Sequence, residues 1–240
     1  MKAADRICIA LDFPTRRETL AMASRLAGRV GWLKVGLEAF VAEGPGLVSE
    51  VAQASGARVF LDLKFHDIPA TVAGAVASAG RSGAAMVNVH ASGGRAMLEA
   101  ARDSARRAGI SKLIAVTVLT SIDAKTLADL PMAGQPEAIA RRLSVLVKEC
   151  GLDGVVCSAQ DVAGIRAACG PEFFTVVPGI RPAGADLGDQ KRVATPGKAV
   201  AAGADLLVIG RPVTAAPDPD AALASILAEI ESASALEHGA

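Results

Sequence analysis

Short apolar segments rich in Val and Ile alternate along the chain with longer Ala-rich segments whose apolar residues have helical spacing. The predicted strands lie at residues 6–11, 32–35, 58–63, 86–90, 112–118, 154–157, 174–177 and 206–209. The predicted helices lie at residues 15–27, 70–82, 94–108, 136–150, 159–168, 196–202 and 221–232. Strand–helix units repeated in this way over 240 residues predict an α/β protein with a (β/α)8 barrel, formed as a single domain over residues 1–240.

Local signals at the ends of the segments support these helices. Thr15 can cap the first helix because Glu18 follows three residues later, and Pro69 and Pro196 suit first-turn positions. A doubly wound open sheet is the main alternative, and it would usually place a glycine-rich phosphate turn after the first strand. Residues 10–14, Ala-Leu-Asp-Phe-Pro, contain no glycine, so the barrel is favoured. The long irregular stretches are residues 123–135 and 182–194, and the candidate disordered tail, with no assigned role, is residues 234–240.

Charge and composition exclude several functional classes. The chain has 25 basic and 25 acidic side chains, which disfavours binding to nucleic acid through a basic surface. Hydrophobic residues make up 51% of the chain, which excludes intrinsic disorder. No apolar run reaches the roughly 18–20 residues that span a bilayer. The chain has no Tyr, so no phenol can act as an acid, base or nucleophile.

The cysteines and histidines form neither a disulfide nor a metal-binding pattern. The four cysteines, at positions 8, 150, 157 and 169, contain no C-x-x-C motif and are expected to be reduced thiols in the core. The histidines are too dispersed to suggest a metal cluster, and we expect His66 and His90 to form hydrogen bonds rather than to act directly in catalysis. The first residues lead into a predicted strand rather than a signal peptide, so we expect a cytoplasmic protein.

Polar or charged residues, or glycine, lie at the end of every predicted strand. They are Asp12; Lys34; Asp62, Lys64 and Asp67; Asn88 and His90; Thr117 and Thr120; Ser158; Gly179 and Arg181; and Gly210 and Arg211. In a (β/α)8 barrel the active site lies at the carboxyl ends of the strands and takes its residues from several of them. The sequence therefore predicts one polar pocket at this rim.

The third strand gives the sharpest functional signal. Its side chains alternate between two faces, so Phe60, Asp62 and Lys64 share the inward face. Burying these two charges is unfavourable unless they are paired or used in function. A purely structural ion pair is the alternative, but a third charge, Asp67, opens the next loop. This array could hold a protonated lysine beside a reacting carbon.

The last two strands are followed by loops that suit a phosphate group. Residues 177–182, Val-Pro-Gly-Ile-Arg-Pro, and residues 208–213, Val-Ile-Gly-Arg-Pro-Val, each place an arginine just after a glycine. Glycine lets backbone amides approach an anion, and arginine offers a forked donor. Phosphate groups in barrels often bind at these two loops, so the sequence predicts a phosphate site there.

With these residues assembled, the chain resembles the orotidine 5'-phosphate decarboxylase family from about residue 7 to residue 219. The motifs that carry the resemblance are Ala10-Leu11-Asp12, Leu33-Lys34-Val35-Gly36, Asp62-x-Lys64-x-x-Asp67-Ile68-Pro69, Val87-Asn88-Val89-His90-Ala91, Pro178-Gly179-Ile180-Arg181-Pro182 and Ile209-Gly210-Arg211-Pro212. The resemblance implies decarboxylation of orotidine 5'-phosphate to UMP in de novo pyrimidine biosynthesis. It also implies that no metal or other cofactor takes part.

The resemblance assigns catalysis to four charged residues. Lys64 would protonate C6 of the pyrimidine, Asp62 would lie beside the substrate carboxylate, and Lys34 and Asp67 would complete a charged tetrad. Asp67 and Thr71 would reach the site of a partner subunit, so a homodimer with shared active sites is expected.

The resemblance also implies a set of substrate-binding residues. They are Asp12, Lys34, Asp62, Ile68, Thr71, Thr120, Ser121, Pro178, Arg181, Gln190, Gly210 and Arg211. Asp12 and Lys34 would contact the ribose hydroxyls, and residues 120–121 would meet the edge of the pyrimidine. The phosphate would be held by Gln190, Gly210 and Arg211. Residues 182–194 would form a lid, with Arg181 on the same closing loop.

Two alternative functions remain open from the sequence alone. Other phosphosugar barrels, such as 3-hexulose-6-phosphate synthase and 3-keto-gulonate-6-phosphate decarboxylase, share an Asp-x-Lys-x-x-Asp-like segment but use Mg²⁺. The loops at residues 179–182 and 208–213 and the run at residues 88–91 favour the pyrimidine enzyme. A non-catalytic sensor of phosphate ligands would need the anion-binding loops but not Lys64.

Overall fold

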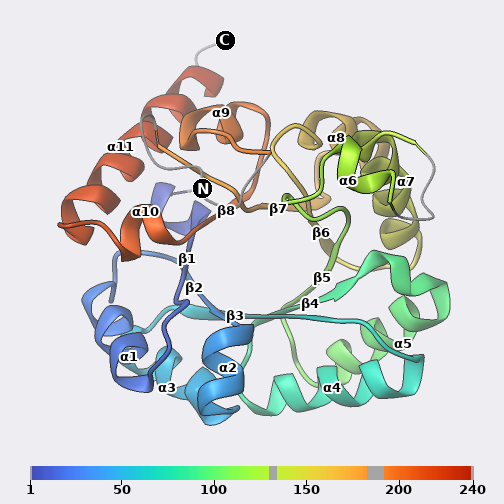
Figure 1. Ribbon diagram of the computed structural model, residues 1–240, viewed down its shortest axis with the longest axis horizontal. Helices are drawn as coiled ribbons and strands as arrows, with labels where there is room; N and C mark the ends of the chain where they lie inside the picture. Colours follow the sequence, from blue (N-terminus) through green and yellow to red (C-terminus); the bar gives the residue numbers. More distant parts are fainter. Residues whose placement is uncertain (1, 130–133, 183–191, 239–240) are drawn as a thin grey trace.

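Eight parallel strands form the closed barrel that the sequence predicts (Figure 1). The computed structural model describes residues 2–129, 134–182 and 192–238. The strands are β1 (Ile7–Ala10), β2 (Trp32–Gly36), β3 (Arg58–Phe65), β4 (Met86–His90), β5 (Lys112–Val116), β6 (Gly154–Val156), β7 (Phe174–Val177) and β8 (Leu206–Ile209). They follow each other around the ring in sequence order, and β1 pairs with β8 to close it.

Helices surround the barrel on its outside (Figure 1). They are α1 (Arg16–Arg25), α2 (Leu37–Glu43), α3 (Gly46–Ser55), α4 (Pro69–Arg81), α5 (Gly94–Arg107), α6 (Ala124–Leu127), α7 (Pro136–Glu149), α8 (Val162–Cys169), α9 (Pro196–Ala201), α10 (Arg211–Thr214) and α11 (Pro219–His238). Two 3₁₀ turns, η1 (Ala3–Arg6) and η2 (Ala91–Gly93), complete the structure. The Thr15 hydroxyl accepts a hydrogen bond from the Glu18 amide and caps α1, as predicted.

The main differences from the predicted elements occur near β3 and at the C-terminus. Helices α2 and α3 and the four-residue helices α6 and α10 are not among the predicted helices; α2 carries the exposed apolar residues Leu37 and Val41, which blur its helical pattern. Strand β3 continues two residues beyond the predicted end, to Phe65. Helix α11 continues to His238, so residues 234–238 of the expected disordered tail are helical.

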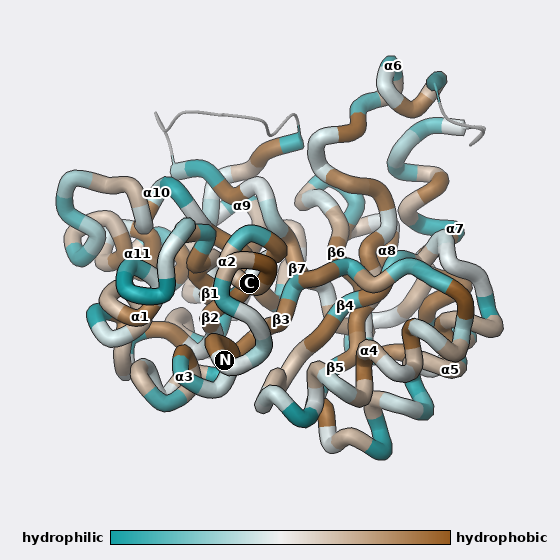
Figure 2. The backbone as a smooth tube through the Cα atoms, turned by 60° about the horizontal axis from the view of Figure 1, so that its bottom comes forward, coloured by the Kyte–Doolittle hydropathy of each residue, from teal (hydrophilic) through white to brown (hydrophobic). Residues whose placement is uncertain are grey.

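Apolar side chains fill two layers. The larger layer packs the outward faces of the strands against the helices. A smaller cluster fills the inside of the barrel, and its largest members are Trp32 and Phe60. Figure 2 shows hydrophobic strands at the centre and more mixed helices around them. The inner cluster fills the interior of the barrel, and in this fold active sites lie at the carboxyl ends of the strands.

Two further predictions concern the chain as a whole. The four cysteines are buried free thiols, as expected. Within the described residues, none of the helices combines the length and the apolar character needed to cross a bilayer.

Candidate active site

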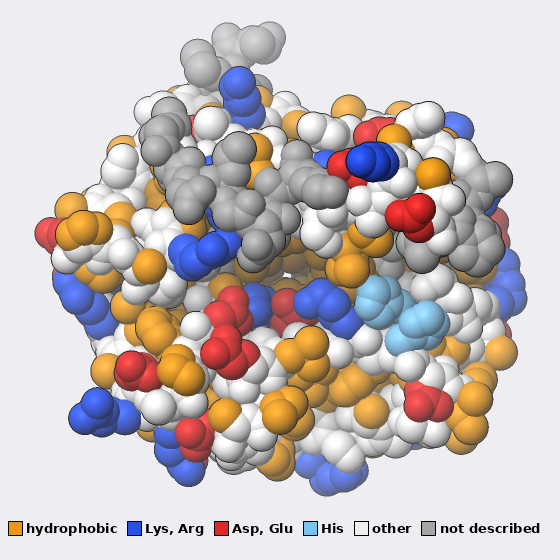
Figure 3. All heavy atoms as spheres, in the orientation of Figure 1, with side chains coloured by type: hydrophobic (Ala, Val, Ile, Leu, Met, Phe, Trp, Pro, Cys, Tyr) orange, Lys and Arg blue, Asp and Glu red, His pale blue; other side chains and the backbone are white. Residues whose placement is uncertain are grey.

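A cavity of about 300 Å³ opens at the carboxyl ends of the strands. The strands β1, β2, β3, β5 and β6 contribute to its lining, and so do the loops that follow β5, β7 and β8. Figure 3 shows the cavity as a hollow at the centre of the barrel face, with charged side chains across it. The structure therefore gathers into one place residues that lie up to two hundred positions apart in the sequence.

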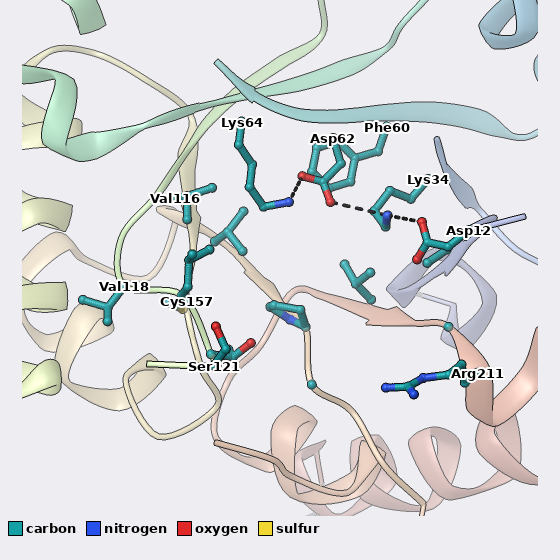
Figure 4. Close-up of a pocket in the computed structure, with 18 of the residues that line it drawn as sticks. Asp12, Lys34, Phe60, Asp62, Lys64, Val116, Val118, Ser121, Cys157 and Arg211 are labelled. Atoms are coloured by element: carbon teal, nitrogen blue, oxygen red, sulfur yellow. Dashed lines mark hydrogen bonds and ion pairs between the residues drawn. The ribbon is translucent and has the colours of Figure 1, made fainter. Parts of the chain in front are cut away.

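Four charged side chains of alternating sign form a row along one wall (Figure 4). Lys34 Nζ lies 2.9 Å from Asp12 Oδ1 and 3.5 Å from Asp62 Oδ2. Lys64 Nζ donates a hydrogen bond of 2.7 Å to Asp62 Oδ1. Strand register explains the row. Lys34 of β2 pairs with Ala10 of β1, and Asp62 of β3 pairs with Gly36 of β2, so the charged residues lie near the carboxyl ends of adjacent strands.

Gly36 leaves the space in which the Asp12–Lys34 pair forms. A Cβ atom at position 36 would lie 2.7 Å from both Asp12 Oδ1 and Lys34 Nζ. Any larger residue would therefore push these two groups apart. The glycine in the Leu33-Lys34-Val35-Gly36 motif thus has a direct role in the geometry of the row.

Burial and pairing act in opposite directions on the central two charges. Burial alone would lower the pKa of Lys34, but the Asp62 and Asp12 carboxylates raise it above its ordinary value. Burial alone would raise the pKa of Asp62, but Lys34, Lys64 and the hydrogen bonds from Lys64 and Asn88 hold it below its ordinary value. Both groups are therefore ionised at neutral pH, and the row carries two positive and two negative charges.

The backbone at Lys64 has an unusual conformation. Within the described part of the chain, Lys64 is the single non-glycine residue with a positive φ, 52°. This left-handed conformation costs an L-residue about 1–2 kcal/mol. It occurs inside an irregularity of β3, where the pairing with β4 shifts between Leu61 and Phe65. Such irregularities re-aim side chains near active sites.

The opposite side of the cavity carries the predicted anion-binding loops. Gly179 and Arg181 after β7 line it, as do Gly210 and Arg211 after β8. Arg181 is buried, and its Nη1 donates a hydrogen bond of 2.9 Å to the carbonyl of Ile180. Figure 4 shows Arg211 across the cavity from the charged row. The two ends of the cavity thus differ in character, since one is a neutral ion-pair row and the other carries arginines.

Less polar groups line the cavity between these two ends. Thr120 and Ser121 follow β5, and Pro178 follows β7. Val116, Val118 and Cys157 add apolar surface. Burial raises the pKa of the Cys157 thiol, with Asp161 adding to the effect, so this group is neutral at physiological pH. A flat, partly apolar ring could lie here with its polar edge toward residues 120–121.

Three predicted site residues lie outside this cavity in the described single chain. Asp67, Ile68 and Thr71 follow the end of β3 and are exposed. Asp67 Oδ1 accepts a hydrogen bond of 2.6 Å from the amide of Ile68. Ile68 is 67% exposed, an unusual degree for a large apolar side chain. Gln190 and most of the predicted lid fall outside the described residues.

The sequence reasoning missed an ion pair that anchors the end of the β7–α9 segment. The Arg192 guanidinium pairs with Asp161, and both side chains are almost fully buried. The amide of Arg192 donates a hydrogen bond of 3.3 Å to the carbonyl of Thr120, and the amide and hydroxyl of Ser158 donate to Asp161. The pair joins segments 31 positions apart, so no local pattern could have indicated it.

The chain is similar to known proteins over most of its length. The model of the "Orotidine 5'-phosphate decarboxylase / HUMPS family" matches residues 5–226. A relative from Anaeromyxobacter sp. (strain K), named orotidine 5'-phosphate decarboxylase, is 55% identical over 229 residues, covering 95% of this chain and 99% of that protein. A relative of the same name from Moorella thermoacetica is 51% identical over 238 residues, covering 96% of this chain and 94% of that protein.

Two solved structures are also similar to this chain over most of its length. Orotidine 5'-phosphate decarboxylase from Lactobacillus acidophilus has a TM-score of 0.81 and 34% identity, and the match covers 94% of this chain and 99% of that one. An uncharacterized conserved protein from Geobacillus kaustophilus also has a TM-score of 0.81, with 40% identity and coverage of 93% and 99%.

Proposed function

The chain belongs to the orotidine 5'-phosphate decarboxylase / HUMPS family, and from this premise we propose that it converts orotidine 5'-phosphate to UMP and CO₂ in pyrimidine biosynthesis. The observation that carries the proposal is the Asp12–Lys34–Asp62–Lys64 row facing an arginine-bearing wall across one cavity. This arrangement suits a substrate with a phosphate at one end and a carboxylate on a ring at the other.

The proposed chemistry uses Asp62 and Lys64, which form one end of the charged row. The substrate carboxylate lies beside Asp62, and two carboxylates about 4 Å apart repel by roughly 4 kcal/mol at an effective dielectric of about 20. The C6–carboxylate bond breaks, CO₂ leaves, and the electron pair stays on C6. The Lys64 ammonium stabilises this carbanion and gives it a proton, and the resulting amine regains a proton from water. The proposed reaction needs no metal or organic cofactor.

The other site residues are proposed to bind the remaining parts of the substrate. Asp12 and Lys34 contact the ribose hydroxyls, and residues 120–121 meet the pyrimidine edge beside Pro178. The phosphate-binding residues are Arg181, Gln190, Gly210 and Arg211. Binding energy from the phosphate, which is remote from C6, then helps to hold the ring against the charged row.

We also propose a homodimer in which Asp67 and Thr71 complete the site of the partner subunit. Supporting this, Asp67 and Thr71 lie outside the cavity of their own chain. They lie close in sequence to the exposed apolar residue Ile68, and Leu37 and Val41 of α2 add further exposed apolar surface. Mixing Lys64→Ala and Asp67→Ala subunits tests the idea, because a mixed dimer would contain one intact site and regain turnover. Mixtures that stay inactive while exchanging subunits would contradict it.

The decisive experiment follows the loss of orotidine 5'-phosphate absorbance with purified protein. Turnover that persists in EDTA is expected, whereas complete loss in EDTA would favour a Mg²⁺-dependent phosphosugar enzyme. Lys64→Ala should still bind UMP but lose turnover, because phosphate and ribose contacts remain while the proton donor is gone. Undiminished turnover in this variant would refute the role of Lys64. Ligand binding without any turnover in the wild-type protein would instead indicate a sensor.

A further inference from the structure

Asn88 of β4 occupies the gap that the irregularity of β3 leaves in the sheet. Leu61 pairs with Val87 and Phe65 pairs with Val89, so residues 62–64 of β3 lie opposite Asn88 alone. The two extra residues interrupt the regular hydrogen bonds between the strands. Asn88 is 1% exposed, so its polar atoms must find partners within the protein.

The Asn88 side chain replaces the missing strand pairing. Its Oδ1 accepts a hydrogen bond of 2.8 Å from the amide of Lys64, the residue with the left-handed backbone. Its Nδ2 donates a hydrogen bond of 2.7 Å to Asp62 Oδ1. Lys64 Nζ donates to the same Asp62 oxygen at 2.7 Å. Asn88, Lys64 and Asp62 therefore form a closed ring of three hydrogen bonds.

The two contacts define which side chain fits at position 88. A carboxylate oxygen of Asp62 requires a donor, and the amide of Lys64 requires an acceptor. Asparagine provides both at this length, and reversing its amide would place a carbonyl oxygen against a carboxylate. Aspartate lacks the donor when ionised, and leucine lacks both groups. The requirement is therefore chemical as well as steric.

From this geometry, and resting on the proposed function, we infer that Asn88 is a positioning residue for decarboxylation. One amide fixes both the carboxylate that faces the substrate and the backbone from which the proton-donating lysine extends. Lys34 Nζ lies 3.5 Å from the other oxygen of Asp62, but neither lysine contact fixes the backbone from which Lys64 extends. Asn88 ties the pair to β4 and holds it in one orientation toward the cavity.

The test compares two variants of the same approximate size with wild-type protein. Asn88→Leu removes both hydrogen bonds, and kcat should fall about 10–100-fold, the cost typical of a small misplacement of reacting groups. The KM for orotidine 5'-phosphate and the affinity for UMP should change by less than about threefold, because the phosphate and ribose contacts are untouched. A kcat within about twofold of wild type in both variants would overturn the inference.

Asn88→Asp adds a readout that a purely structural role would not change. Near pH 8 the new carboxylate lies against Asp62, so kcat should be low. Lys34 and Lys64 keep Asp62 ionised. On acidification the new carboxyl group at position 88 therefore takes up the proton and again provides a hydrogen-bond donor to Asp62. The ratio of wild-type to variant kcat should therefore shrink from about pH 8 to about pH 5.5. A ratio that stays constant with pH contradicts the positioning role.

Controls separate this inference from folding and from the proposed function. Ser104→Ala removes another buried hydrogen bond, of 2.6 Å to the carbonyl of Ala73, on α5 away from the cavity. It should lower stability but leave kcat unchanged. If Asn88→Leu does not fold, Asn88→Asp, which keeps the size and the acceptor, gives the answer. Absence of turnover in wild-type protein would refute the proposed function itself, whatever the variants do.

Discussion

Replacing Lys34 with methionine removes a buried positive charge that lies between the Asp12 and Asp62 carboxylates. The Lys34 and Asp62 side chains are 9% and 12% exposed, and their charged atoms are 3.5 Å apart. At an effective dielectric of about 20, two unit charges at this distance attract by about 5 kcal/mol. The net effect of the single replacement on stability is smaller, because burying the lysine is itself unfavourable.

A double-mutant cycle isolates the attraction from the burial of each group. The free energy of unfolding in urea is measured for wild type, Lys34→Met, Asp62→Asn and the double variant near neutral pH. The expected coupling energy is about 2–5 kcal/mol. Arg95 and Glu149 provide the matched control: their charged atoms are closer, at 2.6 Å, but the side chains are 49% and 55% exposed. Water screens that pair, so its coupling should be several-fold smaller.

The contribution of the pair to stability also depends on pH, and the sign of this dependence follows from the pKa of Asp62. Burial alone would raise its pKa, but Lys34, Lys64 and two hydrogen bonds bring it below the ordinary value. Asp62 therefore stabilises the fold above about pH 3.9 and loses this effect as the pH falls through its lower folded value. In Lys34→Met this loss of stability should occur at a higher pH, because Lys34 no longer lowers the pKa of Asp62. A coupling no larger than that of the exposed control pair would refute the electrostatic reasoning, because it would mean that water screens the row.

Three further predictions concern Arg211 and Cys157 of the cavity and His90 at the end of β4. Arg211→Met should weaken UMP binding about 10–100-fold but leave uridine binding unchanged, as measured by calorimetry; equal losses for both ligands would contradict a phosphate contact. Iodoacetamide should not inactivate the folded enzyme through Cys157, because burial raises the pKa of this thiol; rapid loss of activity at neutral pH would show otherwise. Burial and the nearby His66 lower the pKa of His90, so unfolding free energy should fall as the pH drops below about 6.5, and His90→Gln should reduce this dependence in urea titrations.

The barrel could be predicted from the sequence because its information is local. Each strand is an apolar run that both layers of the core bury, and each helix has its own spacing and capping residues. The helices α2 and α3 escaped prediction because Gly44 and Pro45 divide the segment between β2 and β3 into two short helices, and because α2 exposes apolar residues. Apolar residues on an exposed helix face weaken the amphipathic periodicity by which a helix is recognised.

The site could be predicted where it depends on the ends of the strands and on the alternation of side chains along them. Alternation correctly placed Asp62 and Lys64 on the side of β3 that faces the cavity. It could not indicate the irregular pairing at residues 62–64, since no glycine marks it and Lys64 itself takes the left-handed conformation. The proposed role of Asn88 depends on that irregularity, and the Arg192–Asp161 pair joins two segments that lie 31 positions apart in the sequence. Contacts of this kind arise from the assembled barrel, not from neighbours in the sequence.

The neutrality of the charged row explains why the proposed site needs two opposite ends. Two ammonium groups and two carboxylates cancel, so the row gives an anionic substrate little net attraction, and in the proposed complex Asp62 repels the substrate carboxylate. Affinity must then come from the other end, where Arg181 and Arg211 line the cavity. In the proposed mechanism, separating the two tasks lets the row favour the developing carbanion over the bound carboxylate, which raises kcat and not just affinity. Substrates without the phosphate should therefore lose kcat as well as binding.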